Sequence, residues 1–202
     1  MKRLVIFLAA ALVSLSAAAQ DSFLSHMFLP VDAGVTFATH DAIGGAFYMR
    51  ASLEYRPNIH KGLFVLAELD THTNPYSSGG VVWGNVQSGD AAFTDILIGP
   101  GWRFMLSDSF KIALALQGGT SNMAVKEVSS ASGTPGMYDL KGLDEWQFAA
   151  KGSAMFEYYL NPSFDLFLGV GLPATFVHNE QASAHPLVLF PTLSLGFNMA
   201  LE

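Results

Sequence analysis

The stretch Glu145–Leu160, EWQFAAKGSAMFEYYL, alternates between two kinds of side chain along its whole length. Successive side chains of a β-strand point to opposite faces, so this alternation predicts a strand with one apolar and one polar face. The run is much longer than the usual strand of about five or six residues, and its polar face carries charges of both signs. Such a strand is typical of membrane-spanning β-barrels. Its apolar face would carry Trp146, Phe148, Ala150, Gly152, Ala154, Phe156, Tyr158 and Leu160.

The N-terminus has the pattern of a secretory signal peptide. Lys2 and Arg3 precede an apolar run over residues 4–13, and three alanines at positions 17–19 offer a cleavage site before Gln20. The apolar run is too short for a membrane helix, which needs about 20 residues. We therefore predict a signal peptide over residues 1–19, a periplasmic lead-in over residues 20–30 and a barrel over residues 31–202.

The composition agrees with export and argues against several functions. The net charge is −7, and removing Lys2 and Arg3 makes it −9, so the exported chain would repel phosphate and we expect no nucleic-acid partner. Cysteine is absent, which excludes disulfides, thiol nucleophiles and thiolate metal ligands. We expect no cofactor and no dedicated metal site.

The apolar residues are distributed in strand-sized segments. Half of the residues are hydrophobic and only 13% are charged. We predict eight strands, an even number as in bacterial barrels: residues 31–40, 46–56, 63–72, 93–106, 109–121, 145–160, 163–178 and 186–201. Pro100, Pro173 and Pro191 fall inside these strands. Because proline cannot donate to a ladder, we predict bulges or bends there.

The connections between these strands alternate between short and long. Residues 57–62, 107–108 and 161–162 read as tight turns at one end, while residues 41–45, 73–92, 122–144 and 179–185 would link the strands at the outer end. The two long links carry Tyr76, Trp83 and Tyr138. Exposed aromatic residues suit recognition of a host surface, a polysaccharide or lipopolysaccharide.

With these features the chain resembles the small eight-stranded outer-membrane proteins of the OmpX and OmpA type from about Val31 onward. The resemblance implies an all-β, eight-stranded antiparallel up-and-down transmembrane β-barrel in the outer membrane of a Gram-negative bacterium, in contact with outer-membrane lipid and lipopolysaccharide. It also implies a final-strand signal for the barrel assembly machinery. The positions of that pattern are occupied by Ser194, Gly196, Met199 and Leu201, although the family prefers a final aromatic residue and this chain ends in Leu201-Glu202.

Alternation alone does not decide which face lies inside. A soluble lipocalin-like, ligand-binding barrel would turn its apolar face inward. The low charge, the aromatic residues near strand ends and the alternating connections favour the membrane arrangement. The polar faces then form a lumen network that fills a barrel of this size and leaves no wide pore. We assign to it Arg50, Glu54, Arg56, Glu68, Asp70, Asp95, Arg103, Lys111, Lys151 and Glu157, together with Asp32, Glu145 and Asp165.

The function predicted from these features is structural or adhesive, exerted through the outer loops. The alternative is a lipid A-modifying enzyme, an acyltransferase or deacylase, that uses His, Asp and Ser at the outer mouth. The residues predicted near that mouth are His40, Asp41, Asp70, His72, His178 and His185. The His-x-Ser pattern of the deacylases does not occur in the sequence, so we assign no catalytic residue.

Overall fold

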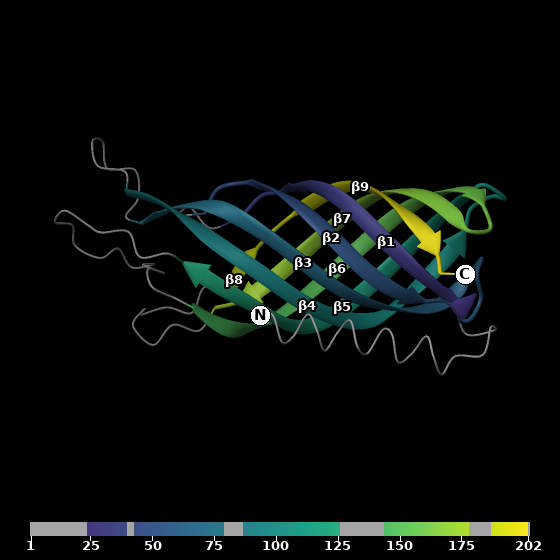
Figure 1. Ribbon diagram of the computed structural model, residues 1–202, viewed down its shortest axis with the longest axis horizontal. Coiled ribbons are helices and arrows are strands. Elements are labelled where there is room, and N and C mark those ends of the chain that lie inside the picture. Colours follow the sequence, from purple (N-terminus) through teal and green to yellow (C-terminus); the bar gives the residue numbers. More distant parts are fainter. Residues whose placement is uncertain (1–23, 40–42, 79–86, 126–143, 178–186, 202) are drawn as a thin grey trace.

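The computed structural model describes residues 24–39, 43–78, 87–125, 144–177 and 187–201, which form one closed antiparallel barrel (Figure 1). Each strand pairs with its neighbours in the chain, and β1 pairs with β9 to close the sheet. The strands are β1 (Met27–Thr36), β2 (Ala46–Tyr55), β3 (Gly62–Ser78), β4 (Gln87–Met105), β5 (Phe110–Val125), β6 (Asp144–Asn161), β7 (Phe164–Phe176), β8 (Leu187–Leu189) and β9 (Thr192–Ala200).

The predicted eight-stranded barrel is confirmed, because β8 and β9 are two parts of one strand. Both pair with β7, and the pairing continues with the same offset from Ala174 opposite Leu189 to Gly171 opposite Thr192. Within the described ranges, no helix has the length and apolar character needed to cross a membrane.

Two strand boundaries differ from the prediction. β1 begins at Met27, and Phe28 already pairs with strands on both sides, so the barrel starts inside the predicted lead-in. The predicted link over residues 73–92 is mostly strand, because the β3–β4 ladder continues from Thr73 to Ser78 opposite Gln87. The polar residues of this segment read as a loop, yet a strand outside the membrane needs no apolar face in order to pair.

The three prolines within the predicted strands leave the register unchanged. Pro100 and Pro173 occupy regular ladder positions, and Pro191 separates β8 from β9 without changing their offset. The prediction of bulges at these positions is therefore wrong. In the described ladders, the register shift lies between Tyr159 and Asn161, beside a tight turn. Pro191 interrupts the last strand because it has no amide hydrogen to contribute.

Short turns close one end of the barrel, as predicted, and side-chain oxygens hold them. The Asn58 Oδ1 accepts hydrogen bonds from the amides of His60 (3.1 Å) and Lys61 (3.3 Å), and Asn161 does the same for Ser163 (3.0 Å). Gly62 ends the first turn with φ of +98°, a conformation that favours glycine. We call this end, with the β2–β3, β4–β5 and β6–β7 turns, the turn end, and the opposite end the loop end.

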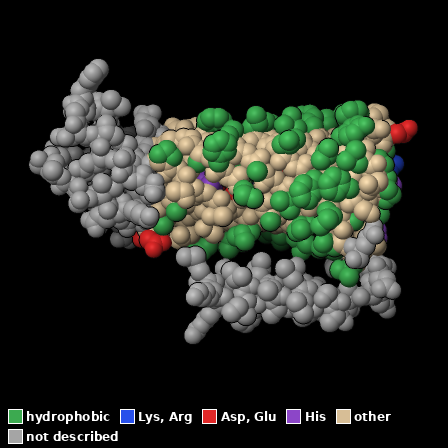
Figure 2. All heavy atoms as spheres, turned by 45° about the horizontal axis from the view of Figure 1, so that its top comes forward, with side chains coloured by type: hydrophobic (Ala, Val, Ile, Leu, Met, Phe, Trp, Pro, Cys, Tyr) green, Lys and Arg blue, Asp and Glu red, His purple; other side chains and the backbone are tan. Residues whose placement is uncertain are grey.

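The barrel turns its apolar face outward and its charged face inward. Phe47 is 85% exposed and Leu116 is 68% exposed, while their polar neighbours in the strands are buried. Figure 2 shows hydrophobic side chains spread over the side of the barrel, with the visible charged side chains mainly at its ends. The soluble alternative, with an apolar interior and a charged surface, is therefore wrong. An exposed apolar surface of this extent requires lipid around it.

A charge placed on this outer face should destabilise the barrel. Leu116 lies near the middle of β5, so Leu116→Arg should lower the free energy of unfolding by about 2–4 kcal/mol, the cost of a cation near the bilayer midplane. The control Leu116→Ile should cost less than about 1.5 kcal/mol. Urea unfolding in lipid vesicles measures both values. Equal stability of the two variants would contradict the assignment of the faces.

Candidate functional site

A network of three acids and three bases fills the lumen at the turn end. Glu54 lies between two guanidinium groups: its Oε1 is 2.6 Å from Arg56 Nε and 2.8 Å from Arg103 Nη2. Arg103 Nε also contacts Glu157 Oε2 at 2.7 Å. Asp165 completes the network by contacting Arg56 Nη1 at 3.1 Å and Lys111 Nζ at 3.3 Å. We call these six residues the turn-end network.

Aromatic rings stack on the guanidinium groups of this network. The Arg56 guanidinium carbon lies 3.7 Å from the centre of the Phe28 ring, and that of Arg103 lies 4.8 Å from the centre of the Phe64 ring. Gly101 permits this packing, because a Cβ at that position would collide with the Phe64 ring. This glycine, which follows Pro100, therefore makes room for a lumen side chain.

Gly196, a member of the predicted assembly signal, also makes room for a ring. A Cβ on Gly196 would lie 2.6 Å from the Phe167 ring. Of the other members of the signal, Ser194 is buried, Met199 is exposed and Leu201 follows β9, where its amide donates to the Met27 carbonyl at 2.9 Å. The signal itself stays a prediction, and packing alone explains the glycine.

A second charged layer, which we call the middle layer, lies farther along the lumen. Arg50 makes a bidentate contact with Asp32, in which Nε donates to Oδ1 at 2.8 Å and Nη2 donates to Oδ2. Its Nη1 is 3.4 Å from Glu68 Oε2. Lys151 also pairs with Glu68. An apolar layer on β3, β5, β6 and β7 lies between these four residues and the turn-end network. Its buried members are Phe64, Leu66, Ala113, Ala115, Met155 and Phe167.

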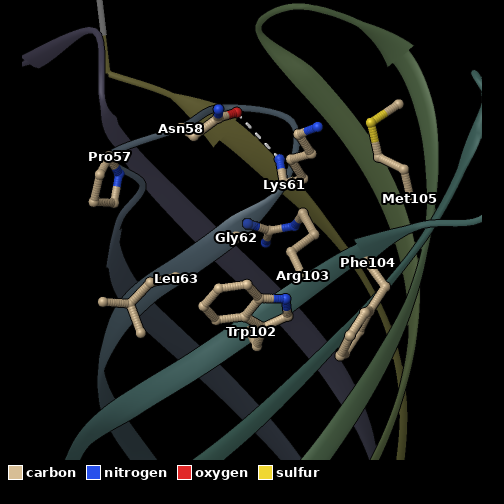
Figure 3. A pocket seen from close by; sticks show the side chains of 9 residues that line it. All are labelled: Pro57, Asn58, Lys61, Gly62, Leu63, Trp102, Arg103, Phe104 and Met105. Atoms are coloured by element: carbon tan, nitrogen blue, oxygen red, sulfur yellow. Dashed lines mark hydrogen bonds between the residues drawn. The ribbon is translucent and has the colours of Figure 1, made fainter.

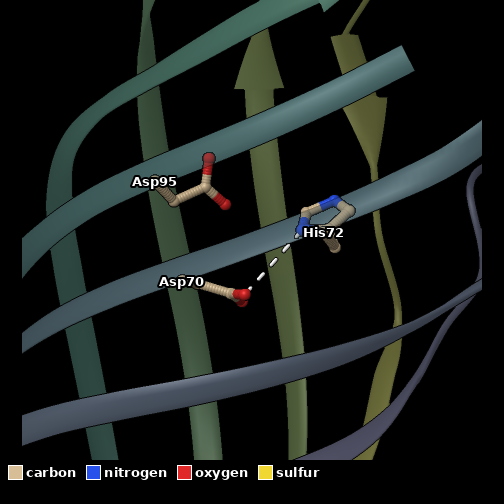
Figure 4. Close-up of side chains that lie close together, drawn as sticks. All are labelled: Asp70, His72 and Asp95. Atoms are coloured by element: carbon tan, nitrogen blue, oxygen red, sulfur yellow. Dashed lines mark ion pairs between the residues drawn. The ribbon is translucent and has the colours of Figure 1, made fainter. Parts of the chain in front are cut away.

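Beyond the middle layer, Asp70 and His72 of β3 face Asp95 of β4 (Figure 4). Asp70 and Asp95 are direct cross-strand partners, and one potential ligand atom from each of the three residues lies within 4.8 Å of the others. His72 Nδ1 is 3.8 Å from Asp70 Oδ1, which is too long for a hydrogen bond. We call these three residues the acid–histidine cluster.

An apolar cap covers this cluster on its loop side. The His72 ring stacks on Phe93, with ring centres 4.9 Å apart, and meets the edge of Phe190 at 5.5 Å. Sequence analysis missed these apolar lumen residues. Phe93 lies two positions before Asp95 in the same strand, so both side chains point to the same face of the sheet. The cap consists of Ile43, Ala91, Phe93, Met123, Val177, Val188 and Phe190, all buried.

The structure places the predicted lumen residues inside the barrel, with one exception. Glu145 is exposed at the start of β6, because it lies where the strand leaves the barrel wall. Asp70 and His72, predicted at the outer mouth, are instead buried in the lumen beneath the cap. Tyr76 lies in β3, so it belongs to a strand and not to a loop. The remaining mouth and loop candidates lie outside the described residues: His40, Asp41, Trp83, Tyr138, His178 and His185.

A hollow of about 720 Å³ lies beside the first tight turn (Figure 3). Trp102, Phe104 and Leu63 are exposed there and Lys61 lies in the adjoining turn. Aromatic residues near the end of a barrel wall are typical of the interface between membrane and water, where lipid head groups contact the barrel. The hollow contains no pair of groups suited to acid–base chemistry, and we assign it to lipid contact.

Solved structures of other proteins share this architecture. Neisserial surface protein A matches with a TM-score of 0.60 and 17% identity, over 87% of this chain and 97% of that one. The outer membrane protein OprG from Pseudomonas aeruginosa matches with a TM-score of 0.50 and 11% identity, over 86% and 94%. The chain has the fold of the small outer-membrane β-barrels. Together with the apolar exterior, this fold makes it an outer-membrane barrel protein. No protein-family profile and no curated sequence matches the chain.

Removing one acid from the turn-end network should leave two buried cations short of a partner. Glu54→Gln should therefore lower the free energy of unfolding by about 3–5 kcal/mol, as expected when one member of a buried ion pair is lost. The control Asp108→Asn, in an exposed turn, should change it by less than about 0.5 kcal/mol. Urea unfolding in lipid vesicles compares the two. Equal stability of both variants would show that the network contributes nothing to the fold.

Proposed function

We propose that this protein is a closed outer-membrane barrel that acts through its loop end as a structural or surface-recognition protein. The observation that carries this proposal is the filled lumen. Glu54 and Arg56 are 0% exposed and Arg103 is 1% exposed, although all three point into the barrel. Side chains that line a water-filled channel would be accessible to water, so these side chains form a plug at the turn end.

The lumen is also closed toward the loop end. The apolar cap contains Phe93 and Phe190, whose rings lie 4.8 Å apart and are both buried. A solute crossing the barrel would have to displace both the cap and the turn-end network. Transport through the lumen is therefore disfavoured, and we assign the function to the surface of the barrel at its loop end.

The β3–β4 hairpin supplies such a surface at the loop end. β2 begins at Ala46 and its ladder with β3 runs only as far as Tyr48 opposite His72, whereas β3 pairs with β4 as far as Ser78. The hairpin therefore extends beyond its neighbour (Figure 1). Tyr76 lies on this extension, and Trp83 and Tyr138 belong to the two long links in the sequence.

The chemistry of these residues favours a neutral sugar partner. Tyrosine and tryptophan offer a flat apolar face with a polar edge, which suits the alternating apolar and hydroxylated faces of a sugar ring. The chain is acidic, so a polyanionic ligand would be repelled. We propose neutral sugar units of a polysaccharide or of lipopolysaccharide as the partner of the loop end.

The enzyme alternative receives less support. A lipid A-modifying site needs its histidine at the lipid-facing mouth, within hydrogen-bond reach of an acyl group. His72 instead faces the lumen and is covered by Phe93 and Phe190. We therefore prefer the scaffold.

A closed lumen should not conduct ions. The protein reconstituted into planar bilayers should give no steady open-channel current at neutral pH. Replacing Phe93 and Phe190 together by alanine should not create one, because the turn-end network still blocks the other end. Protease protection in parallel vesicles confirms insertion. A stable ohmic channel in the wild-type protein would contradict the closed-barrel proposal.

Removal of the aromatic rings should abolish sugar binding without affecting the barrel. The variant Tyr76→Ala/Trp83→Ala/Tyr138→Ala should lose at least about 10-fold of its affinity in a glycan-array or surface-plasmon-resonance assay with neutral polysaccharides, because each ring contact is worth a substantial part of such an interface. Ser130→Ala, in the same long link as Tyr138, is the matched control and should bind as the wild type does. Equal binding by both variants, or binding by neither the wild type nor the control, would overturn this role for the aromatic residues.

A further inference from the structure

We propose that Asp70, His72 and Asp95 bind a divalent transition-metal ion such as Zn²⁺ inside the barrel, between the middle layer and the apolar cap. The proposal departs from the expectation, based on sequence, that the barrel has no metal site. It rests on the charge balance of the lumen, on the unpartnered atoms of the three residues and on their mutual geometry.

Charge balance distinguishes this part of the lumen from the rest. The turn-end network contains three acids and three bases, and the middle layer contains two acids and two bases. The acid–histidine cluster contains two carboxylates and, in the described residues, no lysine or arginine ion-paired to either of them. Arg50 lies directly across from Asp70 on β2, yet its guanidinium contacts Asp32 and Glu68 instead. Two negative charges are therefore left over in a buried site.

The strand register makes this excess unfavourable without a counter-ion. Asp70 and Asp95 are opposite one another on β3 and β4, and both point into the lumen. Like charges at such a pair destabilise a sheet, and burial strengthens their repulsion. A divalent cation between the two carboxylates would neutralise both.

Unpartnered atoms point to the same place. Asp70, His72 and Asp95 are 3%, 6% and 4% exposed. Asp70 Oδ1 and Asp95 Oδ1 are buried without a hydrogen-bond partner, although buried polar atoms nearly always have one. His72 turns Nδ1 toward Asp70, and Nε2 on the other side of its ring is also buried without a partner. The Oγ of Ser121, which lies directly across from Asp95 on β5, is also buried without a partner. Ser121 would support a fourth ligand, either through its own oxygen or through a water molecule.

The donor set and its spacing fit a small transition-metal ion. One imidazole nitrogen and two carboxylate oxygens favour Zn²⁺ over Mg²⁺ or Ca²⁺, which prefer oxygen ligands alone. Tetrahedral zinc holds such ligands about 3.4 Å apart, given metal–ligand distances near 2.1 Å. Asp70 Oδ1 and His72 Nδ1 are 3.8 Å apart and the whole set lies within 4.8 Å, so small side-chain rotations would close the site.

The packing around the cluster fixes the ligands and delays exchange of the ion. Stacking against Phe93 and the edge contact with Phe190 hold the His72 ring in place. The cap also separates the cluster from the loop end, so the ion would enter most readily while the barrel is closing. The test therefore supplies the metal during folding.

The experiment folds the full chain into detergent micelles with Zn²⁺ or Mg²⁺ at equal concentration, followed by removal of free ions and measurement of bound metal by mass spectrometry. The wild type should retain about one Zn²⁺ per chain and no Mg²⁺, and Zn²⁺ should raise its unfolding temperature. Asp95→Asn and His72→Phe, which preserve size or stacking, should each weaken Zn²⁺ binding by more than about 10-fold. Heat-modifiable migration on gels verifies that each variant has folded.

A control variant separates the lumen site from histidines elsewhere. His40→Ala/His178→Ala/His185→Ala removes the other histidines predicted near the loop end and should retain stoichiometric Zn²⁺. Metal that is lost in this control but kept in Asp95→Asn would overturn the proposal. So would a wild type that holds no Zn²⁺ while Asp95→Asn is more stable than the wild type, because a shared proton, and not a metal, would then explain the pair of carboxylates.

Discussion

Lipid offers no hydrogen-bond partner to a backbone amide, and this constraint governs the whole structure. A sheet inside the membrane must close on itself, as it does here where β1 pairs with β9. Closure then leaves two surfaces with opposite requirements, an outer one that must be apolar and an inner one whose polar groups must satisfy each other. These two requirements explain why apolar and polar residues alternate along the strands.

Charge inside such a barrel is costly unless it is paired, and the turn-end network and the middle layer follow this rule. Arg56 and Arg103 share Glu54 at the turn end, while Arg50 and Lys151 share Glu68 farther along. Apart from the contact between Arg56 and Glu54, which lie two positions apart in the chain, these contacts join residues from different strands and so fix the relative position of two parts of the wall. The cost of burying the ions is offset by their mutual attraction only because every base reaches at least one acid at close range.

The division of each strand into an apolar and a polar face, and with it every predicted lumen residue except Glu145, could be predicted from sequence because it depends on local alternation. The charge and the aromatic residues near strand ends were needed to decide which face lies inside. The alternation could not show that Asp70 and His72 lie beneath the cap and not at the mouth, since the position of a residue along the barrel axis depends on how far the neighbouring strands extend. Residues 73–78 were predicted as part of a link but belong to β3. A polar strand outside the membrane has no apolar face, so no alternation of apolar and polar residues identifies it. The packing role of Gly101 and Gly196 could not be predicted for a related reason: the rings that lie against them come from β3 and β7, and no local pattern identifies such partners.

The acid–histidine cluster is the place where the rule of paired charges fails, and its position explains why it can. At the turn end, five strands contribute side chains to one network, and a missing base would leave several groups unsatisfied. Asp70, His72 and Asp95 come from two adjacent strands and have an apolar cap on one side. Few protein groups can reach them, so the sheet itself cannot supply the balancing charge. The two carboxylates of Asp70 and Asp95 are an excess of negative charge in a lumen that is otherwise neutral. Such an excess does not stabilise the fold, and a cation bound from solution explains it more easily.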